Sequence, residues 1–383
     1  MKSPSIIAAG IIAAIVGFAG PLAILLNAAQ SVGATHAEIA SWVTALALSI
    51  AFSTIALSFF YRIPIICSWS TPGLALLAAT NGYTMKEATG AFIVVGLLII
   101  ATAFIKPILL AISRIPSSIS SGMLAGVLLS FVIAAVKTVG TDPWFVLPLI
   151  ILFFIVRLFQ QALAVIAVLL VGILMAYFSS HIAPMPPLEF SALSIIKPEF
   201  SWGTIIGLAI PLYLVTMASQ NLPGFAVLKT FGYNAPIKSC LGVTGLTSAL
   251  TGFFGASTTN ISALSAAICT GPEAHIDKTK RWLTTPYYSL CYLIFALFSS
   301  SIVAFLLALP NTLIILVAGV GLLGAFINAL ILSFSIQREQ LAATITFIIT
   351  ASGLTIFGIG APFWALIAGI IIYNLDFLRY KQK

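Results

Sequence analysis

Charged residues are scarce in this sequence. Asp, Glu, Lys and Arg make up 7% of its 383 residues, against roughly 25% in a typical soluble domain. So few charges cannot cover the surface of a soluble fold, which excludes a soluble enzyme, a secreted disulfide scaffold and a disordered chain. The net charge of +8 comes from basic residues that stand singly between apolar runs, so no basic stripe suggests binding of nucleic acid. Hydrophobic residues reach 61% and the mean hydropathy is +1.16, which indicates a polytopic protein of the lipid bilayer.

Residues for acid–base chemistry and metal binding are few as well. The chain has nine acids, three histidines and four cysteines, and none shows the spacing of a metal site. All nine acids fall at the ends of apolar segments or between them, so the sequence lacks the intramembrane carboxylate that is typical of a proton relay. The densest charged cluster, residues 273–281, is interpreted as a loop with internal salt bridges that orients the chain. We expect no catalytic residue, no metal site and no cofactor.

The apolar segments are long enough to cross a bilayer, which takes about 20 residues per helix. Cutting the chain at charges and at Pro and Gly clusters gives fourteen segments, near residues 6–32, 37–60, 63–82, 88–112, 116–138, 143–158, 160–180, 203–228, 235–254, 256–271, 281–308, 312–335, 340–357 and 361–378. With a cytoplasmic N-terminus, fourteen of the 17 Lys and Arg residues lie inside and three lie outside, Lys86, Lys137 and Lys197. This positive-inside asymmetry predicts fourteen crossings with both termini in the cytoplasm. The crossings divide into two halves of seven, residues 1–180 and 203–383.

Traces of an internal repeat relate the two halves. PLAILLNAAQ (21–30) matches PLYLVTMASQ (211–220) at an offset of 190, and STPGLALLAA (70–79) matches STTNISALSAA (257–267) at an offset of 187. The matches fall on corresponding segments, the first with the eighth and the third with the tenth. Because the second half starts on the opposite side of the membrane, the repeat must be inverted. Inverted repeats with paired interrupted helices indicate a secondary transporter with a site near the midplane.

The third and tenth segments are poor continuous helices. The third contains the helix-breaking run Ser-Thr-Pro-Gly at residues 70–73, and the tenth contains the polar run Ser-Thr-Thr-Asn at residues 257–260. Non-helical backbone at this depth is tolerated only inside protein or beside a cavity. We predict extended chain over 63–69, then a half-helix capped by Ser70 or Thr71, and a second half-helix capped by residues 257–259. Both would begin near the midplane, with their positive dipole ends facing one shared space.

Such a space suits an anion or an electron-rich polar ligand. No Lys or Arg is predicted at that depth, so a bound carboxylate would rely on backbone amides, hydroxyls and amide side chains. Gln30, Gln220 and Asn221 supply donors and acceptors nearby, and Trp69 supplies an aromatic face. The alternative for each small polar residue is that it joins helices to one another, as such residues often do in membranes.

At these same positions the chain resembles the benzoate:proton symporter family of bacteria. The resemblance rests on SWSTPGLALLA (68–78), MASQNLPGFAVLKTFGY (217–233) and AAICTGPEAHIDKTKRW (266–282), and it covers nearly the whole chain. It implies the all-α polytopic membrane fold of the related nucleobase–cation symporters, with 14 transmembrane segments as 7+7 inverted repeats and short strands before the half-helices of segments 3 and 10. It further implies two domains, a core of residues 1–112 plus 203–309 and a gate of residues 113–180 plus 310–383.

The resemblance also implies where the ligand binds. It places ligand contacts in three stretches, at Trp69, Ser70, Thr71 and Gly73, at Ser219, Gln220 and Asn221, and at Ser257, Thr258, Thr259 and Asn260. One departure concerns the tenth segment, where Gly255, Ala256 and Ser257 stand at a place in which the family often has a histidine. An imidazole that could carry the proton is therefore absent there.

Together these features predict a secondary active transporter of the bacterial inner membrane. The expected substrate is a small aromatic carboxylate, benzoate, imported with a proton by an elevator-type movement of the core against the gate. Without a buried acid, protonation of the bound carboxylate itself is the simplest coupling. Alternatives are a nucleobase or other small-anion transporter on the same fold, and an aromatic-acid exporter or passive channel. Related folds often dimerise, so a homodimer is left open.

Overall fold

The computed structural model describes residues 4–80, 82–105, 107, 116–160, 163–178, 187–356 and 359–381. Four basic residues that the topology prediction assigns to the cytoplasmic side lie outside this part of the chain: Lys2, Lys106, Arg114 and Lys383. Parts of the predicted segments 63–82, 88–112, 160–180 and 340–357 lie outside it as well.

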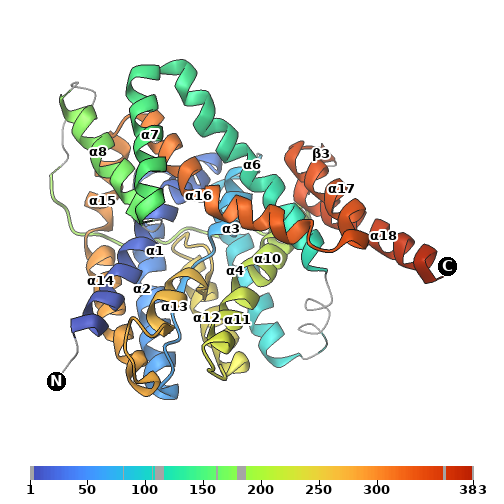
Figure 1. The fold of residues 1–383 in the computed structure, drawn as a ribbon, viewed down its shortest axis with the longest axis horizontal. Helices are drawn as coiled ribbons and strands as arrows, with labels where there is room; N and C mark the ends of the chain where they lie inside the picture. The colour runs from blue at the N-terminus through green and yellow to red at the C-terminus, as the bar shows by residue number, and fades with distance from the viewer. Residues whose placement is uncertain are drawn as a thin grey trace.

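Helices make up most of the described chain (Figure 1). The α-helices are α1 (Pro4–Ser31), α2 (His36–Tyr61), α3 (Thr71–Ala78), α4 (Met85–Phe104), α6 (Ser117–Thr141), α7 (Pro143–Phe159), α8 (Ala164–Phe178), α9 (Trp202–Thr204), α10 (Ile210–Thr216), α11 (Leu222–Thr230), α12 (Ile237–Gly252), α13 (Leu264–Thr270), α14 (Thr285–Leu297), α15 (Ser299–Ala308), α16 (Asn311–Ser333), α17 (Gln340–Ala351) and α18 (Ala361–Lys381). Two π-helical turns, η2 (Ile205–Ala209) and η3 (Met217–Asn221), and two 3₁₀ turns, η4 (Lys278–Thr284) and η5 (Gln337–Glu339), join some of them. The strands are β1 (Cys67–Trp69), β2 (Thr259–Ile261), β3 (Thr355–Ile356) and β4 (Ile359–Gly360), paired as β1–β2 and β3–β4.

Each of the fourteen predicted segments contains at least one of these helices. Among the described residues, six helices are long and apolar enough to cross a membrane, and the pair Lys278–Leu297 and Ser299–Ala308, bent by 67°, forms a seventh candidate. Three further apolar helices are shorter, namely α7, α8 and the apolar part of α18. The protein is thus a mostly helical, multi-pass membrane protein, while the count of fourteen crossings stays a prediction.

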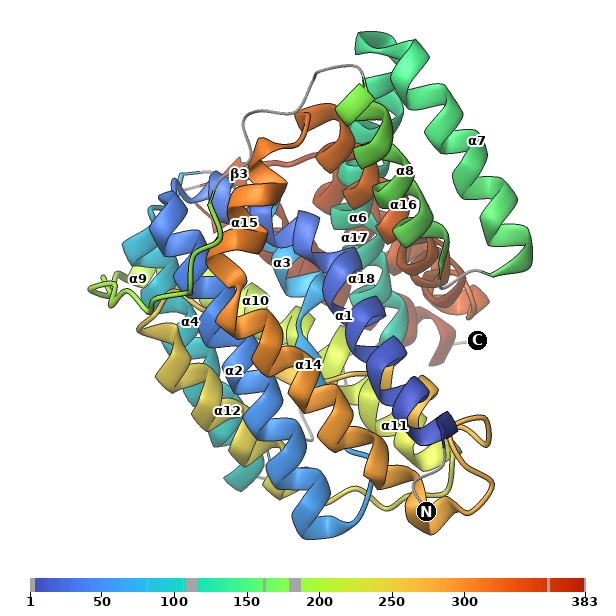
Figure 2. The same ribbon diagram turned by 90° about the vertical axis from the view of Figure 1, so that its left-hand side faces the viewer.

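Two sets of helices pack side by side. α6 lies against α16 and α17, with α18, α7 and α8 around them (Figures 1 and 2). In the other set, α4 lies against α12 and α2 lies against α14, while α1 contacts α3, α13 and α14. α4 and α12 approach closely because glycines face each other. A Cβ atom at Gly245 would lie 2.9 Å from the carbonyl oxygen of Gly96.

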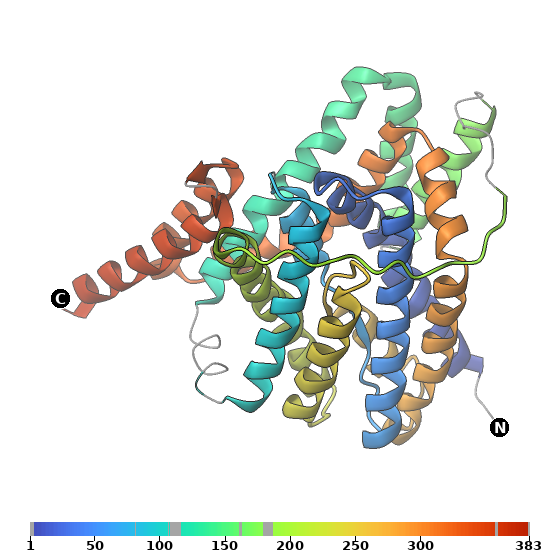
Figure 3. The ribbon, with the colours of Figure 1, turned by 180° about the vertical axis from the view of Figure 1, so that it is seen from behind.

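An extended strap, residues 187–201, crosses the second set of helices (Figure 3). Its backbone N–H groups donate to carbonyl groups at the ends of α14, α12 and α4: Ser191 to Leu297 at 3.0 Å, Ile196 to Phe253 at 2.8 Å and Glu199 to Lys86 at 3.0 Å. The ion pair between Lys86 and Glu199, at 3.6 Å, adds little because both side chains are more than half exposed. The backbone bonds therefore hold this set of helix ends together.

Replacing Gly96 by valine should lower the melting temperature of the protein in detergent. A Cβ atom at this position would lie 2.5 Å from the backbone nitrogen of Ala249, and such overpacking costs about 1–3 kcal/mol. The matched control is Gly242→Ala on α12, where a Cβ atom meets no atom within 4 Å and alanine favours the helix. Equal melting temperatures for the two variants would contradict the close approach of α4 and α12.

Candidate functional site

The two interrupted segments meet through their strands. β1 and β2 are antiparallel, with Cys67 opposite Ile261 and Trp69 opposite Thr259. α3 follows β1 and α13 follows β2, so the two half-helices begin at opposite ends of this short ladder. The predicted pairing of a strand and a half-helix in both segments is therefore present in the structure.

Side chains from neighbouring helices satisfy the outer edges of the two strands. The N–H of Cys67 donates to Thr54 Oγ1 at 3.0 Å, and the N–H of Thr259 donates to Ser248 Oγ at 2.9 Å. Because unpaired backbone groups are costly at membrane depth, these hydroxyls allow a two-stranded ladder to exist there.

The prediction for the start of α3 is confirmed. Ser70 is the N-cap, its Oγ accepts a hydrogen bond from the N–H of Gly73 at 3.1 Å, and Pro72 lies in the first turn. The N–H of Leu74 donates to the carbonyl of Ser70 at 2.8 Å. Ser70 thus satisfies two donors of this turn and Pro72 has none, so the amino end of α3 has less free donor capacity than a bare helix end.

The prediction for the start of α13 is wrong by about five residues. Residues 257–259 do not cap α13, because Thr259–Ile261 pair with β1 and the helix begins at Leu264. Ser262 instead accepts from the N–H of Ser265 at 3.1 Å, in the spacing that Ser70 and Gly73 show. The two serines are 192 residues apart, whereas the sequence match pairs residues 187 apart. The local likeness of STPG and STTN therefore set the two segments in the wrong register.

Ser219, Gln220 and Thr71 form the half-buried polar part of the site. Ser219 and Gln220 lie on the π-helical turn η3, just before Pro223. Pro223 has no N–H to donate to the carbonyl of Ser219, which accounts for the disturbed helix at this point. Gln220 Nε2 donates to Ser68 Oγ at 3.2 Å and to the carbonyl of Trp69 at 3.4 Å. α6 packs against both α3 and η3, so this polar part lies beside the other set of helices.

Asn221 and Asn260 are fully buried and bonded to each other and to β2. Asn221 Nδ2 donates to Asn260 Oδ1 at 3.1 Å, and Asn221 Oδ1 accepts from the N–H of Ile261 at 3.0 Å. Asn260 Nδ2 in turn donates to the carbonyl and the hydroxyl of Thr258. These amides hold η3 against β2.

Ser257 and Thr259 have protein partners too. Trp42 Nε1 donates to Ser257 Oγ at 3.3 Å, and the hydroxyls of Ser49 and Thr259 are 2.6 Å apart. Both side chains are buried. The side chains of residues 257–260, which were predicted to contact the ligand, therefore mainly form hydrogen bonds within the protein.

Gln30 lies away from β1. It lines a cavity of about 610 Å³ with Asn27, Ser31 and Thr80, beyond the carboxyl end of α3, where α6 and the turns around α17 and α18 form the other wall. The residue of α1 that contacts Trp69 is Phe18, twelve positions earlier and so about 18 Å along the helix. The structure does not bring Gln30 together with the other predicted site residues.

Trp69 belongs to an aromatic cluster that was not predicted. The cluster consists of Phe18, Trp69, Tyr288, Tyr292 and Phe295. The ring centroid of Phe18 lies 5.2 Å from that of Trp69 and 4.2 Å from that of Phe295. Tyr288 donates its hydroxyl hydrogen to the carbonyl of Cys67 at 2.8 Å, which ties α14 to β1. The spacing of Tyr288 and Tyr292, one helical turn apart in an apolar segment, was the available signal, because buried tyrosine hydroxyls need partners.

The described acids lie at the ends of the apolar segments or between them, as predicted, but one of them, Glu339, is buried. Glu38 and Glu87 complete capping boxes at the starts of α2 and α4. Glu339, just before α17, is 5% exposed and accepts a hydrogen bond from Ser118 at 2.7 Å. The side chain of Asp376 lies outside the described residues. In the described part of the chain, no group of three His, Cys, Asp or Glu residues could hold a metal ion.

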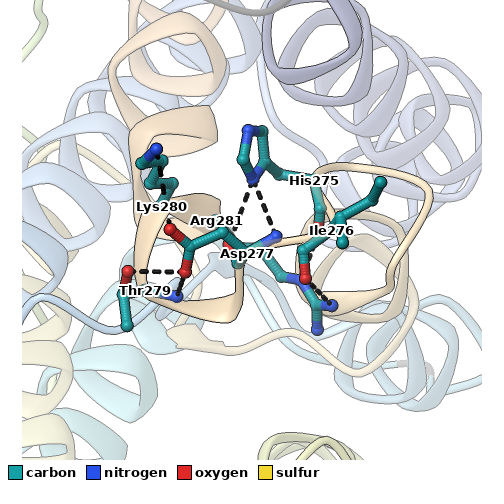
Figure 4. Close-up of polar contacts among 6 residues, drawn as sticks. All are labelled: His275, Ile276, Asp277, Thr279, Lys280 and Arg281. Carbon is teal, nitrogen blue, oxygen red and sulfur yellow. Dashed lines mark hydrogen bonds and ion pairs between the residues drawn. The ribbon is translucent and has the colours of Figure 1, made fainter.

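The charged loop 273–281 is held together by polar contacts among its own residues (Figure 4), and Arg281 joins it to the carboxyl end of α13. Arg281 is 8% exposed and donates to the carbonyls of Thr270 and His275, both at 2.7 Å, and of Ile276 at 3.3 Å. Its charge faces the negative end of the half-helix dipole. The predicted internal salt bridge is present as the pair Lys280 and Asp277, at 3.6 Å. Hydrogen bonds from the hydroxyl and the N–H of Thr279 lower the pKa of Asp277.

Comparison with known proteins places the whole chain. Its sequence matches the family of benzoate membrane transport proteins over residues 1–375. The chain belongs to this family. It is 38% identical to the inner membrane protein YdcO of Escherichia coli, over 97% of this chain and 95% of that protein. It is 31% identical to the benzoate membrane transport protein of Acinetobacter baylyi, over 98% of this chain and 95% of that protein.

Solved structures show that this member of the benzoate transport family has the fold of known anion transporters. The structure of SLC26A9 matches 98% of this chain and 66% of its own, with a TM-score of 0.69 and 11% identity. The transmembrane domain of the cyanobacterial bicarbonate transporter BicA matches 96% of this chain and 97% of its own, with a TM-score of 0.65 and 13% identity. Because the chain belongs to the benzoate transport family, whose relatives are named membrane transport proteins, it is a membrane transporter and not an enzyme.

Replacing Arg281 by glutamine should destabilise this transporter more than loss of a surface charge would. The substitution removes charge-assisted hydrogen bonds to the carbonyl of Thr270 at the end of α13 and to the carbonyls of His275 and Ile276 in the loop, each worth about 1.5–3 kcal/mol. Thermal unfolding in detergent would measure the loss. Lys280→Gln, which removes the exposed partner of Asp277, is the control and should leave the melting temperature nearly unchanged. Equal effects of the two variants would contradict the capping role of Arg281.

Proposed function

We propose that this protein imports a small aromatic carboxylate, benzoate, together with a proton across the bacterial inner membrane. The observation that carries the proposal is Trp69, which joins two different surfaces. Its carbonyl accepts from Gln220 beside the amino end of α3, and its ring stacks on Phe18 in the aromatic cluster. A carboxylate attached to an aromatic ring has the same two parts. Membership in the benzoate transport family supports this reading.

The half-buried polar residues are suited to the carboxylate. Gln220 Nε2 makes two long hydrogen bonds, at 3.2 and 3.4 Å, which a carboxylate oxygen could replace with a stronger charge-assisted one. Thr71 lies in the first turn of α3, where the helix dipole favours negative charge. Ser70, Asn221 and residues 257–260 are positioning residues in this proposal, because they hold α3, η3 and β2 in place.

The proton would travel on the substrate itself. The described acids lie at helix starts, in connecting segments and, for Asp376, near the carboxyl end of α18, apart from the strands and the half-helix starts. Protonation of the bound carboxylate would neutralise the ligand before it crosses, which avoids moving a net charge through a low dielectric. The proposed movement is an elevator, in which the core of residues 1–112 plus 203–309 slides against the gate of residues 113–180 plus 310–383. Both termini would face the cytoplasm, as the distribution of basic residues favours.

A second candidate follows from the structural neighbours. BicA is a bicarbonate transporter and Slc26a9 an anion transporter. A small inorganic anion could use the polar part of the site alone and would leave the aromatic cluster without a role.

Purified protein in proteoliposomes should accumulate labelled benzoate when the interior is alkaline. Because one proton accompanies each carboxylate in this proposal, an uncoupler should abolish accumulation above equilibrium, and saturable kinetics should separate a carrier from a passive channel. Bicarbonate and uracil are the competitors to add. Uptake of either one without uptake of benzoate would overturn the proposed substrate, and accumulation driven by an opposite gradient would indicate an exporter.

Replacing Gln220 by alanine should reduce benzoate uptake at least tenfold while leaving the melting temperature close to that of the wild type. Its side chain is half-buried and makes only long hydrogen bonds, so its loss costs little stability. The matched variant Asn221→Ala leaves the N–H of Ile261 buried without its acceptor, which costs about 1–3 kcal/mol and should lower the melting temperature. Unchanged uptake by Gln220→Ala would remove that residue from the site.

A further inference from the structure

Two buried donors beside the half-helices lack partners. Among the described residues, Trp69 Nε1 and the Tyr292 hydroxyl are buried and make no hydrogen bond, although both side chains are at most 1% exposed. A buried donor without an acceptor costs about 1–3 kcal/mol. Such atoms call for an explanation, and one explanation is a ligand that pairs with them.

Tyr292 presents its hydroxyl at the start of α13. A Cβ atom at Gly17 would lie 2.7 Å from Ser265 Oγ and 3.3 Å from the Tyr292 hydroxyl. Ser265 belongs to the first turn of α13, so the unpaired hydroxyl lies close to the amino end of that half-helix. Because Gly17 has no side chain, α1 can approach α13 and α14 closely at this point.

Phe18, the next residue, packs against the two rings that carry these donors. Its ring stacks on Trp69, with centroids 5.2 Å apart, and meets Tyr292 edge-on, with centroids 6.0 Å apart. The ring of Phe295 also stacks on the ring of Phe18, with centroids 4.2 Å apart. The ring of Phe18 thus lies among aromatic side chains, two of which carry an unpaired donor.

A cavity of about 540 Å³ adjoins Phe18. It lies between α1, α8, α15 and α16, and among its sixteen lining residues Ser301 alone has a polar side chain. The Ser301 hydroxyl already donates to the carbonyl of Glu189 at 2.9 Å and accepts from its N–H at 2.8 Å. The cavity is larger than the roughly 150 Å³ apolar cavity that suffices to bind benzene. It therefore has room for the ring of Phe18 in another rotamer.

We propose that Phe18 is a movable aromatic plug that determines substrate specificity. When an aromatic carboxylic acid binds, the Phe18 ring turns into the apolar cavity and the ring of the substrate takes its place against Trp69. One oxygen of the carboxyl group then accepts from Gln220, as in the proposed function, and the other accepts from Trp69 Nε1 and the Tyr292 hydroxyl. The inference rests on the proposed function, because it names the residue that selects the ring of the same substrate.

Filling the cavity should block the plug. Val317 of α16 lines the cavity and is 2% exposed, so Val317→Phe should occupy the space into which Phe18 turns. Benzoate uptake should fall about tenfold or more, a change comparable with one misplaced group in an apolar pocket. The control is Val136→Phe on α6, the same change at a side chain that is 63% exposed, and it should leave uptake unchanged.

A double-mutant cycle tests whether the loss of uptake in Val317→Phe depends on Phe18. With Phe18→Ala in place, adding Val317→Phe should cause no further loss, because no plug needs the cavity. Phe18→Ala alone should also raise the uptake of 2-naphthoate relative to benzoate about tenfold. If Val317→Phe lowers the melting temperature strongly, Ala23→Phe fills the same cavity from α1 and replaces it in the cycle.

Two results would contradict the proposal that Phe18 is a plug. In the first, Val317→Phe and Ala23→Phe take up benzoate as well as Val136→Phe does. In the second, filling the cavity lowers benzoate uptake by the same factor with and without Phe18→Ala, in protein that remains stable. Failure of the wild type to take up benzoate would instead refute the proposed function, so the two failures are distinguishable.

Discussion

The structure depends on how the chain satisfies backbone groups where two membrane segments stop being helical. β1 and β2 have three residues each and pair with one another, which leaves one edge of each strand open. Helices on both sides fill these edges with side chains, Thr54 from α2, Ser248 from α12 and Asn221 from η3. Unpaired groups at this depth cost several kcal/mol each, so the polar side chains in these helices are first of all the partners of the two strands.

This arrangement explains why so many small polar residues are present and yet few face a ligand. Asn221 and residues 257–260 are predicted ligand contacts, and each has an internal partner in the structure. The side chains left for a substrate are those at the margin of the network, where Gln220 makes long hydrogen bonds and Trp69 keeps a free donor. A rigid, fully bonded frame with a few unsatisfied groups is what a specific binding site requires, since the frame prevents those groups from pairing with the protein instead.

The aromatic cluster adds a surface beside the half-helices that the shared architecture does not by itself provide. SLC26A9 and BicA share the architecture at 11% and 13% identity, so the architecture itself does not select the ligand. Phe18 and Tyr292 add apolar and weakly polar surface beside the same half-helices, and α1, α13 and α14 come close enough to do so because Gly17 has no side chain. In the proposed function, the aromatic walls select a ring-bearing ligand, and the polar residues beside the half-helices hold its carboxylate.

The membrane class, the interrupted segments and the start of α3 could be predicted from the residues alone, because these features follow from composition and from local rules. Ser70 and Pro72 mark a helix start wherever they occur in this spacing, and the Thr-x-x-Glu pairs at Thr35 and Thr84 do the same for α2 and α4. Three features could not be predicted in this way: the register of β1 with β2, the separation of Gln30 from Trp69 and the contact of Phe18 with Tyr292. These contacts join residues far apart in the chain, and no local propensity reports which distant strand or helix face will supply the partner.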